Sequence, residues 1–277
     1  MPVIYNSTPV ALSVAGSDCS CGAGAQADLK TFSAHGVYGL TALTCVVAEV
    51  PGRVTRIDAI APGMLAEQLK LLLTAFPVVA MKSGMLPSRE HVEAIGLVLD
   101  GLPPDRVPKI VVDPVMVATS GDKLIDDCAI AALQTELFPR AVLLTPNMGE
   151  ASVLLGREVI SAADLEPAAR ALADRYETAV LVKGGHLTEG AARDCLVTRT
   201  GTVCYFDSEF VQDRDTHGTG CTLSAAIAAN LAKGIPLEDS IRSAKRYVHA
   251  AIEHILRWNG ESAGKIDALN HFAQPGA

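Results

Sequence analysis

A glycine-rich segment at residues 215 to 224 places a thiol among glycines and hydroxyl residues. Its sequence is Asp-Thr-His-Gly-Thr-Gly-Cys-Thr-Leu-Ser, and the helical pattern AAIAANLAKG follows directly. The first backbone N–H groups of a helix have no partner inside it, so a glycine turn at this point can direct three or four of them at one ligand. Gly218 and Gly220 therefore predict an anion-binding turn.

Cys221 lies in this turn, and its chemistry depends on the helix that follows. The dipole of a helix N-terminus lowers the pKa of a thiol, so we expect enough thiolate near neutral pH to take a proton from an attacking hydroxyl. Fixed N–H dipoles also stabilise the charge that spreads over the oxygens of a transferring phosphoryl group. A small cysteine packed in the core is the alternative. The glycine turn favours phosphoryl transfer, with Cys221 as the base.

Polar side chains also follow three short apolar runs. Asp113 ends KIVVD, Asn147 and Glu150 follow AVLLTP, and Lys183 ends AVLVK before two glycines. Carboxylates suit Mg²⁺, directly or through water, and an ammonium group neutralises phosphate charge. Taken singly, a strand-end Asp is better explained as a turn former and a Lys as a solvated charge. Because the carboxyl ends of parallel strands share one edge of a sheet, together they indicate a phosphoryl-transfer centre.

A second glycine-rich loop, over residues 16 to 24, allows a different chemistry. Residues 22 to 27 fit the G-x-G-x-x-A dinucleotide fingerprint, and Glu49 could bind a ribose hydroxyl, as in an NAD-dependent dehydrogenase. That fingerprint follows its strand almost directly, whereas here residues 16 to 21 intervene before Gly22. A glycine turn that only connects a strand to a helix is the third interpretation.

The elements that position these residues follow from the apolar pattern. Runs of strand type occur at residues 10–16, 40–48, 78–81, 109–113, 141–145 and 179–183. Helical stretches separate them, such as residues 61–75 with apolar residues at three-four spacing. Right-handed crossovers then give an α/β fold with a central, mostly parallel sheet flanked by helices on both faces.

The pattern changes towards the C-terminus. Residues 193–199 and 202–207, joined by Thr200 and Gly201, predict a small hairpin near residues 193–207. Only helices are expected after it, at 219–233 and 238–257, and the tail 259–277 is expected to be loosely structured. At 277 residues, the chain is expected to form a single domain over 1–277.

Charge and composition exclude several classes of function. The chain has 23 Lys and Arg against 31 Asp and Glu, and no basic block that would bind nucleic acid or anionic lipid. It also lacks a signal peptide pattern and a stretch of about 18 uncharged apolar residues, so we expect no membrane partner and a cytoplasmic location. The seven cysteines include no Cys-x-x-Cys pair, so neither disulfides nor a zinc site is expected.

Together these segments resemble the hydroxymethylpyrimidine/phosphomethylpyrimidine kinases of thiamin biosynthesis, a branch of the ribokinase-like superfamily. The resemblance covers nearly the whole chain and is most specific over residues 216–224. The other matching segments are residues 15–18, 22–24, 26–32, 37–39, 82–85, 113–116, 145–147 with Glu150, and 183–186. The resemblance implies an ATP- and Mg²⁺-dependent kinase. It would phosphorylate the hydroxymethyl group of 4-amino-5-hydroxymethyl-2-methylpyrimidine and then the monophosphate.

The resemblance also implies a role for each site residue. Cys221 matches the catalytic base, which is Asp in the sugar kinases of the superfamily, and Gly218 and Gly220 match its anion hole. The residues that match the pyrimidine pocket are Gly16, Asp28, Glu49, Met85 and Val115. Those that match the ATP site are Asn147, Lys183, Thr216 and Gly218, and Lys183 also matches a catalytic position. Asp113 and Glu150 match the Mg²⁺ site. A carboxylate such as Glu49 can accept from the donor edge of a protonated ring, while apolar side chains pack on its faces. A homodimer is implied as well.

The first loop departs from the family pattern. Cys19 and Cys21 stand where the family usually has a Pro and a Gly, and the loss of that Gly could reshape the edge of the pocket. A related branch phosphorylates pyridoxal and shares the Gly-x-Gly-Cys segment, so a pyridoxal kinase is the alternative. Glu49 favours the pyrimidine, because those relatives often carry an uncharged residue there. A ligand sensor that kept the pocket without the chemistry is a further alternative.

Overall fold

The computed structural model describes residues 7–116, 125–185, 191–209, 211, 217–260 and 264–273, and a nine-stranded sheet runs through them. The strands, in the spatial order β3-β2-β1-β4-β5-β6-β7-β8-β9, are β1 Val10–Asp18, β2 Tyr38–Val50, β3 Arg53–Ala59, β4 Val78–Ser83, β5 Lys109–Val112, β6 Leu143–Leu144, β7 Val180–Lys183, β8 Ala191–Val197 and β9 Val203–Glu209. Strands β2, β1, β4, β5, β6 and β7 pair in parallel, and β3, β8 and β9 are antiparallel at the two edges.

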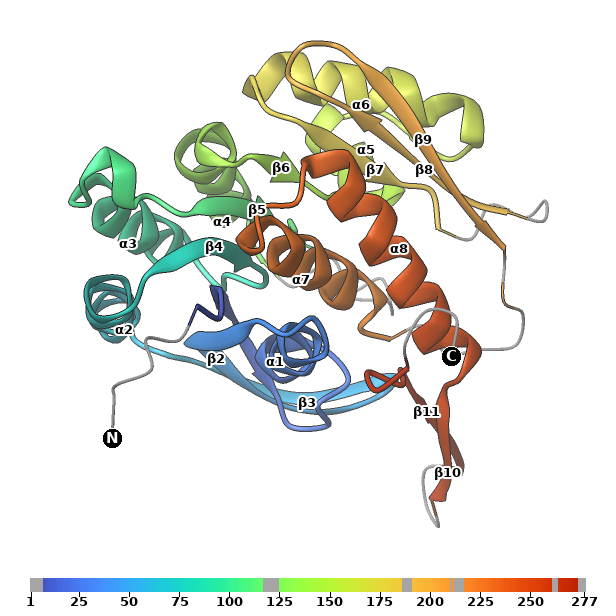
Figure 1. Ribbon diagram of the computed structural model, residues 1–277, viewed down its shortest axis with the longest axis horizontal. Coiled ribbons are helices and arrows are strands. Elements are labelled where there is room, and N and C mark those ends of the chain that lie inside the picture. Colours follow the sequence, from blue (N-terminus) through green and yellow to red (C-terminus); the bar gives the residue numbers. More distant parts are fainter. Residues whose placement is uncertain are drawn as a thin grey trace.

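Helices cover both faces of this sheet (Figure 1). They are α1 Gly24–Ala34, α2 Pro62–Ala75, α3 Arg89–Asp100, α4 Asp127–Ala132, α5 Met148–Leu155, α6 Ala162–Tyr176, α7 Thr219–Ala232 and α8 Leu237–Glu253. A π-helical segment, Leu133–Leu137, and 3-10 turns at Pro104–Arg106 and Phe138–Arg140 complete the helical part. Helices α1, α7 and α8 form one layer, and α2 to α6 form the other. The predicted α/β fold is confirmed.

Strand alternation decides which polar residues meet. Successive side chains of a strand point to opposite faces, and the buried apolar residues of β4, β5 and β7 alternate between the two helical layers accordingly. Lys82, Asp113 and Lys183 each come two positions after a residue that packs in the layer of α7. They therefore face α7 together, at the carboxyl end of the sheet.

The expected strands and the hairpin are present, and one edge strand was not predicted. The missed strand, β3, is exposed along its whole length, so its sequence RVTRIDA has no continuous apolar run to mark it. The predicted hairpin is formed by β8 and β9, which extend the sheet beyond β7. Strand β6 is shorter than the run at 141–145 that predicted it.

The two helices predicted near the C-terminus are confirmed as α7 and α8, but the prediction for the segment after them was wrong. Helix α8 ends at Glu253, and β10 Leu256–Gly260 pairs antiparallel with β11 Gly264–Ala268, where only helices and a loose tail were expected. Arg257 donates to both oxygens of Asp267, at 2.7 and 2.9 Å, across this pair. This cross-strand contact stabilises the hairpin, and an apolar pattern does not reveal it.

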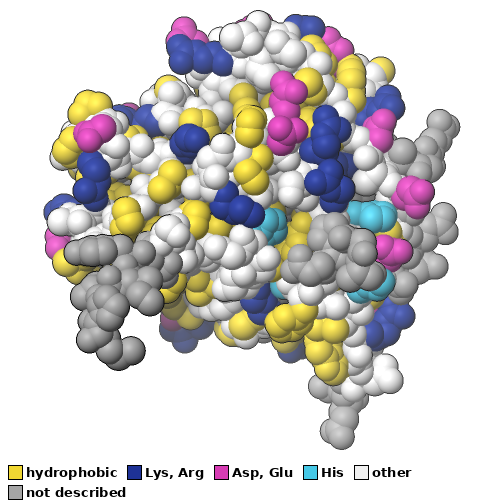
Figure 2. Space-filling model, viewed as in Figure 1, with side chains coloured by type: hydrophobic (Ala, Val, Ile, Leu, Met, Phe, Trp, Pro, Cys, Tyr) yellow, Lys and Arg dark blue, Asp and Glu magenta, His cyan; other side chains and the backbone are white. Residues whose placement is uncertain are grey.

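Charged side chains of both signs are interspersed on the face shown in Figure 2. Apolar side chains gather over the region of the β10–β11 hairpin (Figure 2). Trp258, in β10, is 53% exposed, and Phe272, which follows β11, is 81% exposed. Within the described ranges, no helix combines the length and the apolar character that a membrane span requires.

Candidate active site

The turn before α7 lies against the carboxyl end of the sheet. Gly218 begins the helix with a φ of 83°, and a Cβ on it would lie 1.8 Å from the carbonyl oxygen of Gly22, so only glycine fits. A Cβ on Gly220 would lie 3.3 Å from Lys183 Nζ and 3.6 Å from Asp113 Oδ2. The first turn of α7 is thus packed against an ammonium and a carboxylate. Thr216, which was also expected here, lies outside the described residues.

Asp113, just after β5, and Lys183, at the end of β7, form an ion pair across the end of β6, the strand between them. Lys183 Nζ donates to Asp113 Oδ1 at 2.9 Å, and Thr145 Oγ1 donates to the same oxygen at 3.2 Å. Burial favours the neutral acid, but Lys183 and Lys82 hold the pKa of Asp113 below its ordinary value. Asp113 is therefore a buried, ionised carboxylate beside the α7 turn.

Asn147 and Glu150 form a capping box at the start of α5. Asn147 Oδ1 accepts from the Glu150 amide at 2.9 Å, and Glu150 Oε2 accepts from the Asn147 amide at 2.8 Å. A parallel bridge between Asn147 and Lys183 sets this helix start beside β7. Burial raises the pKa of Glu150 to about 7, against an opposing effect of Lys183 and with a smaller rise from Asp113.

This acidic pair fits a divalent cation. Oxygen ligands are what Mg²⁺ prefers, and a cation near Asp113 and Glu150 would favour the ionised form of Glu150, which burial and the charge of Asp113 disfavour. In the described part of the chain, no three His, Cys, Asp or Glu side chains gather into a ready metal cluster. Further ligands would come from water and from the phosphates of a bound nucleotide.

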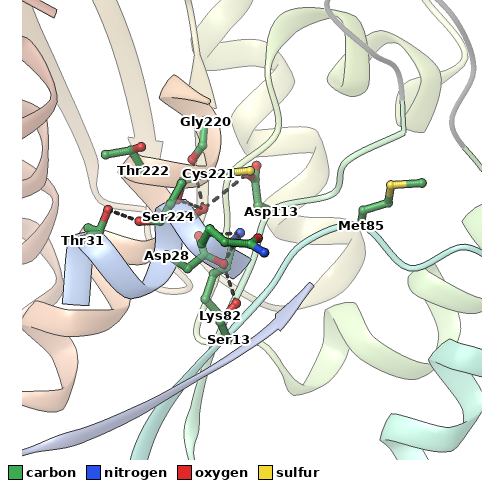
Figure 3. A network of polar contacts seen from close by, with 12 residues as sticks. Ser13, Asp28, Thr31, Lys82, Met85, Asp113, Gly220, Cys221, Thr222 and Ser224 are labelled. Carbon is green, nitrogen blue, oxygen red and sulfur yellow. Dashed lines mark hydrogen bonds and ion pairs between the residues drawn. The ribbon is translucent and has the colours of Figure 1, made fainter. Parts of the chain in front are cut away.

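A second ion pair lies beneath the turn, between β4 and α1 (Figure 3). Lys82 Nζ donates to both oxygens of Asp28, at 3.0 and 2.9 Å, and Ser13 Oγ donates to the same carboxylate. Both side chains of the pair are fully buried. Burial opposes the charge on Lys82, but Asp28, Cys221 and Asp113 together raise its pKa. The Asp28 carboxylate, expected at the pyrimidine, is thus engaged by protein groups.

The thiol of Cys221 lies among these charges and is partly exposed. Burial and the carboxylates of Asp28 and Asp113 raise its pKa, against the opposing effects of Lys82 and the Gly24 amide. The expectation of a lowered thiol pKa was wrong, because the helix dipole is weaker here than desolvation and two nearby anions. In the free protein, this thiol is mainly protonated near neutral pH.

Sequence reasoning gave no role to Lys82 or Ser224. Ser224 Oγ lies 3.3 Å from Asp113 Oδ2 and within 3.1 Å of the carbonyl oxygens of Gly220 and Cys221, so it joins the α7 turn to Asp113. A lysine inside the apolar strand VVAMKS and a serine inside the buried helix α7 were available signals, since charged and hydroxyl groups are buried only with partners.

The first glycine loop is organised by Asp18. Its Oδ2 accepts from the amides of Gly22 and Ala23 at 3.0 and 2.8 Å. Burial opposes the charge on Asp18, but the contact with His217, followed by the hydrogen bonds from Ala23 and Ser20, outweighs burial and lowers the pKa of Asp18 to about 2. The amides of Gly22 and Ala23, which directly precede α1, are therefore already taken by a side chain. The dinucleotide interpretation fails on this point, because those amides would have to face a pyrophosphate.

Glu49 lies near this loop, at the end of β2. It is half-buried, and burial together with the charge of Asp18 raises its pKa, which His217 partly offsets. His217 Nε2 lies 3.6 Å from Asp18 Oδ2, so the loop connects the region of Glu49 to the α7 turn. Cys21, where the family usually has glycine, has a left-handed φ of 60°.

The remaining predicted residues lie around this centre. Gly16 is buried at a bulge of β1, where a Cβ would lie 2.7 Å from Cys45 Sγ, so its role is close packing of β1 on β2. Met85 is held by its carbonyl oxygen, which accepts from Thr44 Oγ1 at 2.8 Å, and it lies apart from the Asp113–Cys221 cluster in Figure 3. Val115 is half-buried just beyond Asp113.

Comparisons with known proteins give consistent results over nearly the whole chain. A family model described as phosphomethylpyrimidine kinase matches residues 18–267. The chain is 46% identical over 268 residues to the hydroxymethylpyrimidine/phosphomethylpyrimidine kinase of Rhizobium meliloti (strain 1021), covering 96% of this chain and 97% of that protein. Among solved structures, an ADP complex of Bacillus subtilis pyridoxal kinase is similar with a TM-score of 0.86 and 36% identity, covering 96% and 98% of the two chains. The phosphomethylpyrimidine kinase of Clostridium difficile 630 has a TM-score of 0.76 and 33% identity, covering 88% and 100%.

Proposed function

This chain belongs to the phosphomethylpyrimidine kinase family, and we propose that it transfers the γ-phosphoryl group of ATP to two acceptors in turn. The first is the hydroxymethyl oxygen of 4-amino-5-hydroxymethyl-2-methylpyrimidine, and the second is the phosphate of the resulting monophosphate. The chain is thus a kinase of thiamin biosynthesis. The observation that carries the proposal is the packing of the Gly218–Cys221 turn against Asp113 and Lys183.

The proposed chemistry assigns one task to each group in the centre. The amides of the α7 turn bind the oxygens of the transferring phosphoryl group, and the Lys183 ammonium neutralises their charge. Cys221 accepts the proton of the attacking hydroxyl, and the buried Lys82 favours the thiolate that this requires. Glu49 binds the donor edge of the pyrimidine, at the far side of the first loop.

We propose that Asp113 and Glu150 hold Mg²⁺, directly or through water. The ion supplies charge neutralisation on the phosphates of ATP when bound. The ADP complex of the similar Bacillus subtilis protein supports the use of an adenine nucleotide. Because ATP is the donor, we expect the enzyme to act in the cytoplasm.

An assay with purified protein tests the function. With ATP and Mg²⁺, the pyrimidine alcohol should be converted to a monophosphate and then a diphosphate, each identified by its mass. The monophosphate supplied alone tests the second step separately. Absence of a phosphorylated product from both acceptors would overturn the proposal.

Pyridoxal is the second candidate acceptor, because pyridoxal kinases are among the solved structures similar to this chain. The carboxylate of Glu49 favours the aminopyrimidine, whose ring offers a donor edge. The same assay with pyridoxal compares kcat/KM for the two alcohols. We expect the pyrimidine to be the better substrate. A higher kcat/KM for pyridoxal would make pyridoxal the preferred substrate and overturn this expectation.

We propose further that two copies of the chain form a homodimer. Strand β3 is an exposed sheet edge, and apolar side chains are exposed on β2 and β3. An unpaired edge with apolar side chains is a surface that proteins usually cover.

A further inference from the structure

Cys19 makes two contacts that neither the family resemblance nor the proposed chemistry uses. Its Sγ lies 3.2 Å from the carbonyl oxygen of Glu49, to which it donates, and 3.4 Å from the Glu49 amide, from which it accepts. One thiol therefore takes both backbone groups of Glu49. These contacts lie where the β1–β2 ladder ends, since its last paired residues are Asp18 and Val47.

The backbone of Glu49 pairs with Val54 of β3 on one side and with the Cys19 thiol on the other. The β2–β3 register shifts between Ala48 and Glu49, so β2 is irregular at this residue. The neighbouring β1 strand has ended, and the side chain of Cys19 extends the pairing two residues further along β2. The thiol replaces backbone pairing where regular pairing has stopped.

Cys19 is itself fixed by the loop that reaches α7. Its amide donates to the Val47 carbonyl oxygen at 3.4 Å, and the adjacent Asp18 carboxylate binds the amides of Ser20, Gly22 and Ala23. Gly22 in turn packs against Gly218, where a Cβ would overlap its carbonyl oxygen. A continuous series of contacts thus joins Glu49 to the anion-binding turn.

We propose that Cys19 is a positioning residue that fixes Glu49 relative to the Gly218 turn, and that it thereby sets the affinity for the pyrimidine. This role rests on the proposed contact of Glu49 with the ring. The proline that usually stands at this position in the family offers no polar side-chain atom, so the device is a property of this chain's own sequence.

Affinity measurements with two Cys19 variants test the role. Cys19→Val places a somewhat larger, apolar side chain at this exposed position and loses both hydrogen bonds, so the Kd for the pyrimidine alcohol should rise about five- to tenfold, as expected for loss of weak hydrogen bonds. The Kd for ATP and the Tm should stay unchanged. Cys19→Ser, whose hydroxyl both donates and accepts, should restore most of the affinity. Cys128→Ala removes another exposed thiol, on α4, and should behave as wild type.

A double-mutant cycle shows whether Cys19 acts through Glu49. In the Glu49→Gln background, Cys19→Val should change the pyrimidine Kd by less than about twofold, because the positioned carboxylate is already lost. An equal loss in both backgrounds, or wild-type affinity in Cys19→Val, would reject the role of Cys19 alone. If Glu49→Gln leaves pyrimidine binding unchanged, then the pocket assignment in the proposed function fails, and the inference fails with it.

Discussion

At the scale of single residues, the environment of Cys221 determines the pH range that suits its chemistry. Burial, Asp28 and Asp113 favour the thiol, whereas Lys82 and the Gly24 amide favour the thiolate, and the balance raises the pKa of Cys221. A base must be deprotonated to act. The proposed reaction should therefore gain from rising pH in the neutral to alkaline range.

Cys221→Ala tests the base directly. We expect kcat to fall by at least about 10²-fold, with KM for the pyrimidine and for ATP largely retained, because a general base acts in the transition state. The rise of kcat with pH should also disappear from the residual activity. Steady-state kinetics from pH 6 to 9 measure both effects, with Cys128→Ala as the matched control. Unchanged turnover in Cys221→Ala would exclude the thiol as base.

Glu150 predicts a pH dependence of stability. Its pKa of about 7 lies above the ordinary value of 4.5, so between these values the folded state binds more protons than the unfolded state. This contribution to stability is complete below about pH 4.5 and is lost as the pH rises through 7. Glu150→Gln keeps an acceptor for the capping box, so its Tm relative to wild type should increase between pH 5 and pH 8, by about 2 to 4 °C per kcal/mol. Thermal unfolding measures the difference. Glu158→Gln removes the charge of an exposed glutamate and serves as the control. If Tm changes with pH in the same way in Glu150→Gln and in wild type, then the pKa of Glu150 is not raised.

At the scale of elements, the sequence predicted the strands that carry the site better than the contacts inside it. Apolar runs marked the parallel strands, and their polar end residues, Asp113 and Lys183, meet as expected. Strand β3 and the β10–β11 hairpin were missed because their stability comes from edge pairing and a cross-strand ion pair. The partner of Asp28 could not be predicted either, since Lys82 lies 54 residues away and only the sheet order brings the two together.

Two glycines with similar backbone conformations flank α7, one before it and one after it. Gly218 and Gly234 have φ angles of 83° and 78°, but a Cβ would overlap Gly22 only at Gly218, while Gly234 has open space around it. Gly218→Ala should reduce kcat/KM for ATP by at least about 10²-fold, because the phosphate-binding turn must move. Gly234→Ala should cost only about 1 kcal/mol of stability and leave kinetics unchanged. Equal kcat/KM values for Gly218→Ala and Gly234→Ala would show that the Gly218 turn does not take part in catalysis.

The Lys82–Asp28 pair holds α1 against β4. Lys82→Met leaves a buried carboxylate without its partner and should lower the free energy of unfolding by about 3–5 kcal/mol. The loss should be smaller at acidic pH, where Asp28 is protonated, and smaller in the double variant Lys82→Met/Asp28→Asn. Denaturant unfolding at two pH values measures these differences. An equal loss in the single and double variants would show that the pair itself is not the cause.

At the scale of the whole molecule, the continuous sheet and the return of α7 and α8 onto it agree with one folding unit over residues 1–277, which we propose as a single domain. The site takes residues from β1 through α7, so no half of the chain contains it. The exposed edge at β3 lies at the side of the sheet to which Glu49 belongs. Assembly through that edge would lie close to the pyrimidine.

The homodimer can be tested at this edge. Light scattering should give about twice the chain mass of 29.0 kDa. Val54→Lys places a charge on the exposed apolar surface of β3 and should shift the protein towards the monomer. Leu71→Lys makes the same change on α2, where the side chain is 69% exposed, and should leave the dimer intact. A monomeric wild-type protein would refute the assembly.

The binding of the Gly22 and Ala23 amides by Asp18 has a consequence for the order of events. With those two amides taken, we place the phosphoryl group at the α7 turn in both additions. After the first addition, the reacting oxygen lies one phosphate further from the ring. Before the second phosphorylation, the monophosphate must either shift within the site by the length of one phosphate or dissociate and bind again. A chase with unlabelled monophosphate during turnover distinguishes the two, since only a departing intermediate is diluted.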